Sequence, residues 1–148
     1  MGSVIFIIIT FFTDDIEKSV ISKIQQNIEA PLILDEVEFT IYESFPSASV
    51  KITNLLILES KEFNNDTLLF AKHSYVKISL LDMINKNYNL QNIIIIDGKI
   101  NIKYNNLNSP NFLIFKKNPK NKNPLSIKKI ALLNTELNIK KEIPILDI

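Results

Sequence analysis

Few residues of this sequence belong to the types that catalyse reactions. His73 is the only histidine and there is no cysteine, which excludes a metal site shared by two histidines and a thiol nucleophile. Asp82 and the many serines leave a Ser-His-Asp set possible by composition, but the chain has no Gly-x-Ser-x-Gly elbow. We therefore expect a surface role for His73, and we predict no enzyme activity, no catalytic residues, no metal site and no cofactor.

Adjacent carboxylates occur at Asp14-Asp15 and at Asp35-Glu36. Neighbouring residues of a strand point to opposite faces, so Asp35 and Glu36 are not expected to share a proton as a hydrolase pair would. Asp14-Asp15 fits the first turn of a helix, where negative charge is favourable. A hydrolase built around His73 is therefore the least favoured function.

The composition is that of one folded domain. The chain has 148 residues, of which 46% are hydrophobic and 22% charged, enough apolar material for a packed core. Its net charge of +1 argues against nucleic-acid binding, which requires an excess of positive charge on one face. With only 2 glycines, a glycine-rich phosphate loop is also excluded.

The segment Val4–Phe12 is apolar except for Thr10. It is shorter than the roughly 20 residues that span a bilayer. It has two interpretations, part of a transmembrane anchor or a buried core segment. The abrupt change to Thr13-Asp14-Asp15 favours a partial transmembrane anchor over residues 1–13.

The next residues have the pattern of an amphipathic helix over residues 14–30. Thr13 or Asp14 is a suitable N-cap, and Pro31 would end the helix. The apolar residues recur at helical spacing: Ile16, Val20, Ile21, Ile24 and Ile28. Core packing explains this stripe better than a membrane surface, which would require more lysine on the polar face.

From Leu32 onward the apolar period is two, which predicts half-buried strands. We expect strands around residues 37–41, 50–58, 75–80, 90–96, 100–104, 127–133 and 137–139. Asp97-Gly98 is a typical hairpin signal between two of them. Residues 81–86 suit one short helical turn. Residues 105–124 form a polar loop whose lysines either stay in solvent, which we favour, or attract anionic lipid headgroups.

One stretch of the sequence resembles a known protein family. Phe45–Asn54 reads FPSASVKITN and resembles a segment near the N-terminus of AsmA-like proteins, where a strand enters a Phe-Pro-Ser turn and a second strand ends in Asn. Later segments resemble that family in the same order: Leu68–Lys72, Val76–Leu80, Leu81–Ile84 with Asn87-Tyr88, Ile93–Ile102 and Leu125–Leu137. Asn111 matches a turn of the family, but the glycine expected there is missing.

The resemblance covers nearly the whole chain and implies a fold and a location. AsmA-like proteins carry one N-terminal transmembrane helix in the bacterial inner membrane, with the bulk of the protein in the periplasm. They are similar to bridge-like lipid transfer proteins, whose β-sheets curl into a long groove. The resemblance therefore implies a fragment of a longer protein, in which residues 31–148 begin an AsmA-like β-groove domain.

We accordingly expect a mainly β (α+β) fold, with an N-terminal membrane or amphipathic helix followed by a curled antiparallel sheet. Such a sheet exposes one apolar face unless something covers it. Phospholipid acyl chains would do so, and each sheltered methylene is worth roughly 0.8 kcal/mol. The candidate lipid-facing residues are Val37, Phe39, Ile41, Val50, Ile52, Val76, Ile78, Ile100 and Ile102. The alternative is that they form the ordinary core of a β-sandwich.

Two functions outside catalysis remain. The first is lipid transport or outer-membrane biogenesis through the apolar groove, with membrane lipids and the inner membrane as partners. The second is a structural or assembly role in the envelope, in which a sheet edge pairs with a strand of a partner protein. Neither involves nucleic acid.

Overall fold

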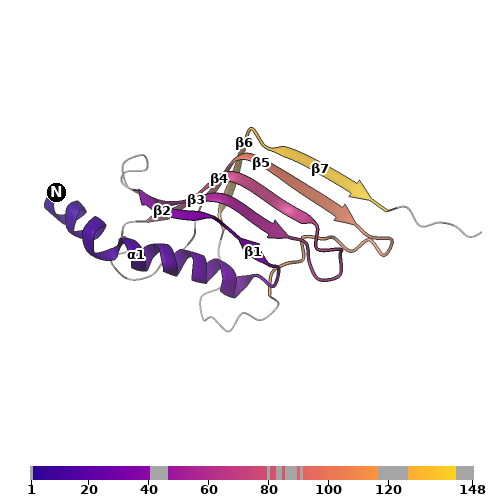
Figure 1. The fold of residues 1–148 in the computed structure, drawn as a ribbon, viewed down its shortest axis with the longest axis horizontal. Helices are drawn as coiled ribbons and strands as arrows, with labels where there is room; N and C mark the ends of the chain where they lie inside the picture. Colours follow the sequence, from indigo (N-terminus) through magenta and orange to yellow (C-terminus); the bar gives the residue numbers. More distant parts are fainter. Residues whose placement is uncertain are drawn as a thin grey trace, which may run out of the picture.

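The computed structural model describes residues 2–40, 47–79, 81–82, 85, 90, 92–116 and 127–142, and only the backbone of residues 2–13. One helix packs on one seven-stranded sheet that is not closed on itself (Figure 1). The elements are α1 (Gly2–Asn27), β1 (Leu32–Ile33), β2 (Glu36–Thr40), β3 (Ser47–Leu58), β4 (Thr67–Ser79), β5 (Asn92–Tyr104), β6 (Lys129–Leu133) and β7 (Glu136–Lys141). The mainly β prediction is confirmed.

The helix α1 joins the two N-terminal segments that the sequence separated. It runs without a break from Gly2 to Asn27, so the N-cap predicted at Thr13 or Asp14 is wrong. No proline or glycine lies inside this stretch, and nothing in it forces a helix to stop. Asn27 closes the last turn, since its side-chain Nδ2 donates a 2.7 Å hydrogen bond to the carbonyl of Lys23.

Among the described residues, no helix has both the length and the apolar character needed to cross a bilayer.

The sheet is mixed, which corrects the prediction of an antiparallel sheet. Its order is β1 and β2 end to end along β3, then β4, β5, and finally β6 and β7 end to end along β5. The pairs from β1 to β5 are antiparallel, whereas β6 and β7 run parallel to β5. Parallel neighbours need a long return connection, and the chain from residue 105 to 128 provides it.

The hairpin predicted at Asp97-Gly98 is also wrong. β5 continues through both residues without reversing and pairs with β4 on either side of them, from Asn92 to Ile100. Asp97 has a left-handed backbone with φ of 52°. Hairpin turns require this conformation, and this is why an Asp-Gly dipeptide usually predicts one. Here that conformation bends a strand and does not reverse it.

Asp97 belongs to a row that crosses the whole sheet, which we call the kink row. The registers on both sides align Asp35, Asn54, Lys72, Asp97 and Asn134. Three of these residues have a positive φ: 51° at Asn54, 52° at Asp97 and 46° at Asn134. A left-handed residue interrupts the alternation of side chains along a strand. Ile52 and Leu55 are consequently both buried in the same core cluster, although they are three residues apart.

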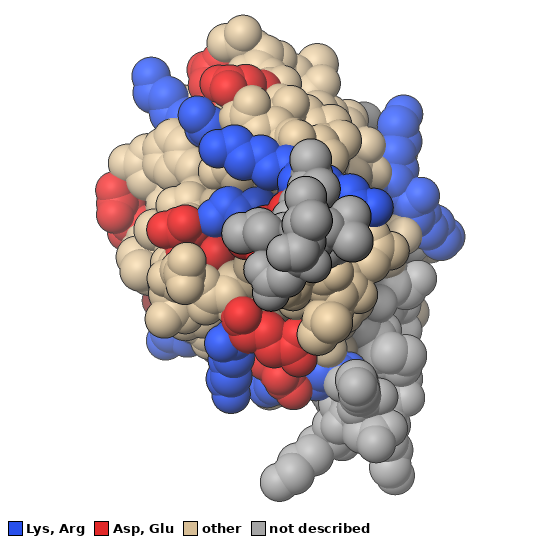
Figure 2. All heavy atoms as spheres, turned by 90° about the vertical axis from the view of Figure 1, so that its right-hand side faces the viewer, with Lys and Arg blue, Asp and Glu red and all other residues tan. Residues whose placement is uncertain are grey.

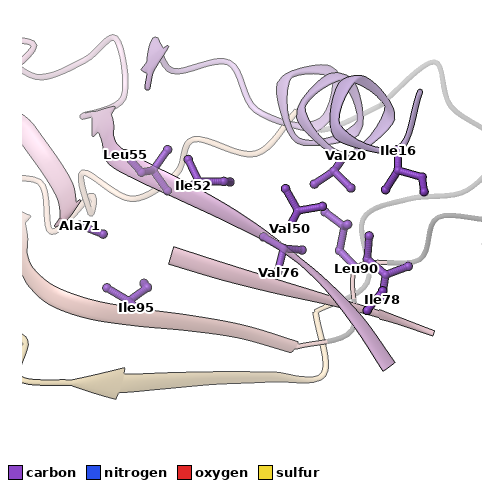
Figure 3. Packing of buried hydrophobic residues seen from close by; sticks show 11 residues of the cluster. Ile16, Val20, Val50, Ile52, Leu55, Ala71, Val76, Ile78, Leu90 and Ile95 are labelled. Atoms are coloured by element: carbon purple, nitrogen blue, oxygen red, sulfur yellow. The ribbon is translucent and has the colours of Figure 1, made fainter. Parts of the chain in front are cut away.

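The main core lies between α1 and the half of the sheet nearest to it. Ile16 and Val20 of α1 point toward Val50, Val76 and Ile78 of β3 and β4 (Figure 3). All five side chains are 2% exposed or less. The backbone amide of Phe39 in β2 donates a 2.8 Å hydrogen bond to Glu17 Oε1 and so ties β2 to the helix.

A second, smaller core lies at the C-terminal end of α1. It joins Ile28 and Ala30 to Leu68 of β4 and to Ile114. The amide of Glu29 donates a 2.7 Å hydrogen bond to the carbonyl of Ile114, so the segment after β5 is fixed against the end of the helix.

Leu81 and Asp82 are helical, and the amide of Asn85 donates a hydrogen bond to the carbonyl of Leu81, as expected for a short helical turn.

Candidate functional site

The face of the sheet that contacts α1 is lined mostly by apolar side chains on every strand from β2 to β7, and we call it the apolar face. The strand registers place its residues in transverse rows, one from each strand. Two rows lie before the kink row: Phe39, Val50, Val76, Ile93, Ile130; and Val37, Ile52, Ser74, Ile95, Leu132. Beyond the kink row comes a row of Leu55, Ala71, Gly98 and Thr135, and after it a row of Leu32, Ile57, Leu69, Ile100 and Leu137. Ile102 and Ile139 follow it.

Two observations place Ile100 and Ile102 on this face. A Cβ added at Gly98 would lie 2.9 Å from Cγ2 of Ile95, which is part of the main core. Gly98 therefore faces the core side, and alternation puts Ile100 and Ile102 on that side too. Independently, Ile100 pairs with Leu69, which also packs against the main core.

The helix covers only part of the apolar face. In Figure 1, α1 runs along β1, β2 and β3, while β6 and β7 form the opposite edge of the sheet. On the apolar face, four aliphatic side chains of that edge are exposed, and we call them the open strip: Ile130 (56%), Leu132 (43%), Leu137 (50%) and Ile139 (65%). Leu133 of β6 is also exposed (53%), but it alternates to the opposite face. The kink row and Thr135 separate Ile130 and Leu132 from Leu137 and Ile139, so the open strip consists of two pairs of exposed aliphatic side chains along one edge. Exposed apolar surface of this kind is a candidate binding site.

The predicted lipid-facing residues divide between the covered and the uncovered parts of this face. Val50, Ile52, Val76 and Ile78 are 2% exposed or less. Val37 and Phe39 are half-buried and pack against the same core. In all six, the core packing accounts for the apolar side chain without a ligand. Ile41 lies outside the described residues.

Ile100 and Ile102 are the predicted residues that lie next to the open strip, and both are half-buried. The open strip itself was not among the predicted site residues. The alternation of residues 129–141 identifies strands, but it does not reveal that they lie at the edge farthest from the helix.

The opposite face carries a polar cluster, which we call the Lys103 cluster: Lys103, Glu59, Asp66 and Asn111. Nζ of Lys103 lies 2.8 Å from Glu59 Oε1 and 2.7 Å from Asp66 Oδ2. The side chain of Glu59 is fully buried, and Asn111 Nδ2 donates a 3.0 Å hydrogen bond to its Oε1. Hydrogen bonds to Asp66 and then to Glu59 raise the pKa of Lys103 above its ordinary value.

The charges of this cluster are paired, although Glu59 Oε2 is buried with no hydrogen-bond partner among the described residues. A shallow pocket of about 290 Å³ opens beside it and is also lined by Lys99 and Lys140. Lys103 is neutralised by two carboxylates, and Lys99 lies 3.6 Å from Glu136. Figure 2 shows basic and acidic side chains side by side over this end of the molecule. The cluster therefore serves to hold β5 to the loops around Glu59 and Asn111.

The chain matches no protein-family model, no curated protein and no solved structure. The resemblance to AsmA-like proteins therefore stays a prediction.

The structure separates the residues that composition allowed for a Ser-His-Asp set. β4 runs extended from His73 to Ser79 before reaching Asp82, a length of roughly 20 Å at 3.3 Å per residue. His73 is half-buried, and its Nδ1 is buried with no hydrogen-bond partner among the described residues. Within those residues, no three histidine, cysteine or acidic side chains are grouped for a metal ion.

Proposed function

We propose that this protein binds lipid as an AsmA-type component of the bacterial envelope, with acyl chains sheltered on the open strip. The observation that carries the proposal is the row of exposed aliphatic side chains on β6 and β7, continuous with a core that α1 only partly covers. The proposed setting is the inner membrane, with the bulk of the protein in the periplasm.

The proposed ligand fits the chemistry of this surface. Ile100 and Ile102 together with the open strip offer only aliphatic side chains, as hydrocarbon requires. Each methylene removed from water is worth roughly 0.8 kcal/mol, so several methylenes along the strip suffice for binding in the absence of a polar anchor. Sheltering a lipid requires no catalytic group.

The proposed attachment to the membrane rests on the sequence of Val4–Phe12. These residues begin α1, so an apolar segment of the chain is continuous with the helix that packs against the sheet. A membrane-held N-terminus would keep the apolar face close to its source of lipid.

Native mass spectrometry of the protein extracted in mild detergent tests the proposal. We expect bound phospholipid, with occupancy lowered by about tenfold in Leu137→Asp and Ile139→Asp. Both side chains are at least half exposed, so both variants should fold. The matched control is Leu107→Asp, an 84% exposed leucine outside the strip, which should keep its lipid. Folded wild-type protein that takes up no phospholipid would refute the proposal.

A second candidate function is envelope assembly by strand pairing. The observation that favours it is the outer edge of β6 and β7, along which no other described strand lies. An unpaired edge offers backbone donors and acceptors to a partner strand. Retained strand-mediated association in protein free of lipid would favour this function over the first.

A further inference from the structure

We propose that β7 pairs with β7 of a second copy of this chain, antiparallel and centred on Asn138. The proposal depends on the edge that supports the second candidate function and is independent of lipid binding. It names a partner, a register and a set of contacts that can each be tested.

Backbone geometry limits the possible registers. The amide of Glu142 donates a 2.9 Å hydrogen bond to the carbonyl of Tyr104, so residue 142 directs its backbone groups toward β5. Because this direction alternates along a strand, residues 137, 139 and 141 direct theirs toward the free edge. Two copies can then bond only by pairing odd-numbered residues with odd-numbered residues, and the symmetry axis must pass through a residue.

Among these registers, the side chains favour the one centred on Asn138. It places Glu136 opposite Lys140 of the second copy and Leu137 opposite Ile139 of the second copy, and symmetry produces each pair twice. Centring on Ile139 would oppose Glu136 to Glu142. Centring on Leu137 would oppose Lys140 to Asn134 and form no ion pair. Of these three registers, only the one centred on Asn138 forms ion pairs.

This pairing would give both the aliphatic and the charged side chains of β7 a matching neighbour in the second copy. Leu137 and Ile139 are at least half exposed. Leu137 of each copy would pack beside Ile139 of the other copy. Lys140 has the usual role of a lysine on an edge strand, which is to discourage pairing, but a second copy presents Glu136 to it. The open strips of the two copies would then join across the symmetry axis.

A single-cysteine variant tests the register directly, because the chain contains no other cysteine. In the proposed register Asn138 faces its own equivalent in a pair with no backbone hydrogen bonds, with Cα atoms about 4.5 Å apart, within the range of a disulfide. We expect Asn138→Cys to form a covalent dimer under mild oxidation. The control is Ile130→Cys, which is exposed on β6 but remote from the axis. Equal cross-linking of the two variants would overturn the register.

Charge reversal tests the pairing without a covalent bond. Two six-residue strands bury less area than a stable complex, so we expect a dissociation constant of about 100 μM by sedimentation. Glu136→Lys and Lys140→Glu each oppose like charges and should be monomeric alone. Mixed together, they restore both ion pairs and should form a heterodimer. A mixture that stays monomeric, with each variant folded by circular dichroism, would overturn the proposal.

Lipid occupancy measured on the same charge-reversal samples separates this proposal from the lipid function. The substitutions lie on the polar side of β7, so loss of the dimer with unchanged lipid is the result expected here. A wild type that binds lipid but forms no dimer would refute self-pairing and leave the lipid proposal standing.

Discussion

Asn54 Nδ2 donates a 2.7 Å hydrogen bond to Asp35 Oδ2, and this contact joins β3 to the break between β1 and β2. At the other side of the sheet, Asn134 donates the equivalent bond to Asp97. Both contacts lie in the kink row, and in each the amide donor sits on a left-handed backbone. The asparagine side chains thus hold the strands at the positions where the backbone interrupts its alternation.

Two substitutions of Asn54 should separate the contribution of its side-chain hydrogen bond from that of its tolerance of a left-handed backbone. Asn54→Gly keeps the left-handed backbone but loses the hydrogen bond, so the free energy of unfolding should fall by about 1 kcal/mol. Asn54→Ala also places a Cβ in the unfavourable region and should cost about 2 kcal/mol. Urea denaturation measures both values. Equal losses would mean that the positive φ of Asn54 carries no cost.

The Lys103 cluster should respond more strongly, because Glu59 is fully buried. Lys103→Met leaves that carboxylate without its cation and should lower the free energy of unfolding by about 3 kcal/mol. Adding Glu59→Gln removes the orphaned charge and should restore part of the loss. A double-mutant cycle in urea measures the coupling. Additive effects of the two substitutions would show that the pair is not coupled.

The same lysine predicts a dependence on alkaline pH. Its two carboxylate partners raise the pKa of Lys103 in the folded protein. A lysine whose pKa is higher in the folded than in the unfolded protein stabilises the fold fully at pH values below its unfolded pKa of about 10.4. This stabilisation is lost as the pH rises through the pKa of the folded protein. Urea midpoints from neutral to strongly alkaline pH should therefore fall more in the wild type than in Lys103→Met. Parallel curves for the two proteins would contradict this account.

Gly98 should tolerate no side chain, although its backbone φ is not positive. An added Cβ would lie 2.8 Å from the carbonyl oxygen of Phe70 and 2.9 Å from Cγ2 of Ile95. Since the first contact is with backbone, β4 and β5 would have to separate, and Gly98→Ala should cost about 2 kcal/mol. Thermal unfolding measures the change. An unchanged midpoint would show that the strands can move apart freely.

The alternation of apolar residues was enough to predict most strands, because a half-buried strand alternates by local geometry. It could not predict the fate of Asp97-Gly98. A left-handed Asp before Gly suits a hairpin as well as a bent strand, and the choice depends on pairing with β4. The parallel edge was missed for a similar reason, since its register depends on residues far apart in the chain.

The candidate site was predicted only in outline. Alternation shows that Val50 and Ile100 face an apolar environment, but it does not show what covers each of them. In the structure α1 buries Val50, whereas Ile100 lies beside the exposed Leu137. Thr13-Asp14-Asp15 resembled a helix start, yet acidic residues also occur inside a helix where they face solvent, as the exposed Asp14 and Asp15 do in α1.

The parallel edge also has a consequence for the order of folding. β3 and β4 are joined by the short connection between Leu58 and Thr67, so they close a small loop. Asn92 pairs with Lys129, and the whole connection from residue 105 to 128 separates their strands in the chain. Contacts of high sequence separation form late, because the entropy of closing the loop must be overcome first. β6 and β7 should join a preformed sheet and leave it first, so their amide hydrogens would exchange with solvent before those of β3 and β4.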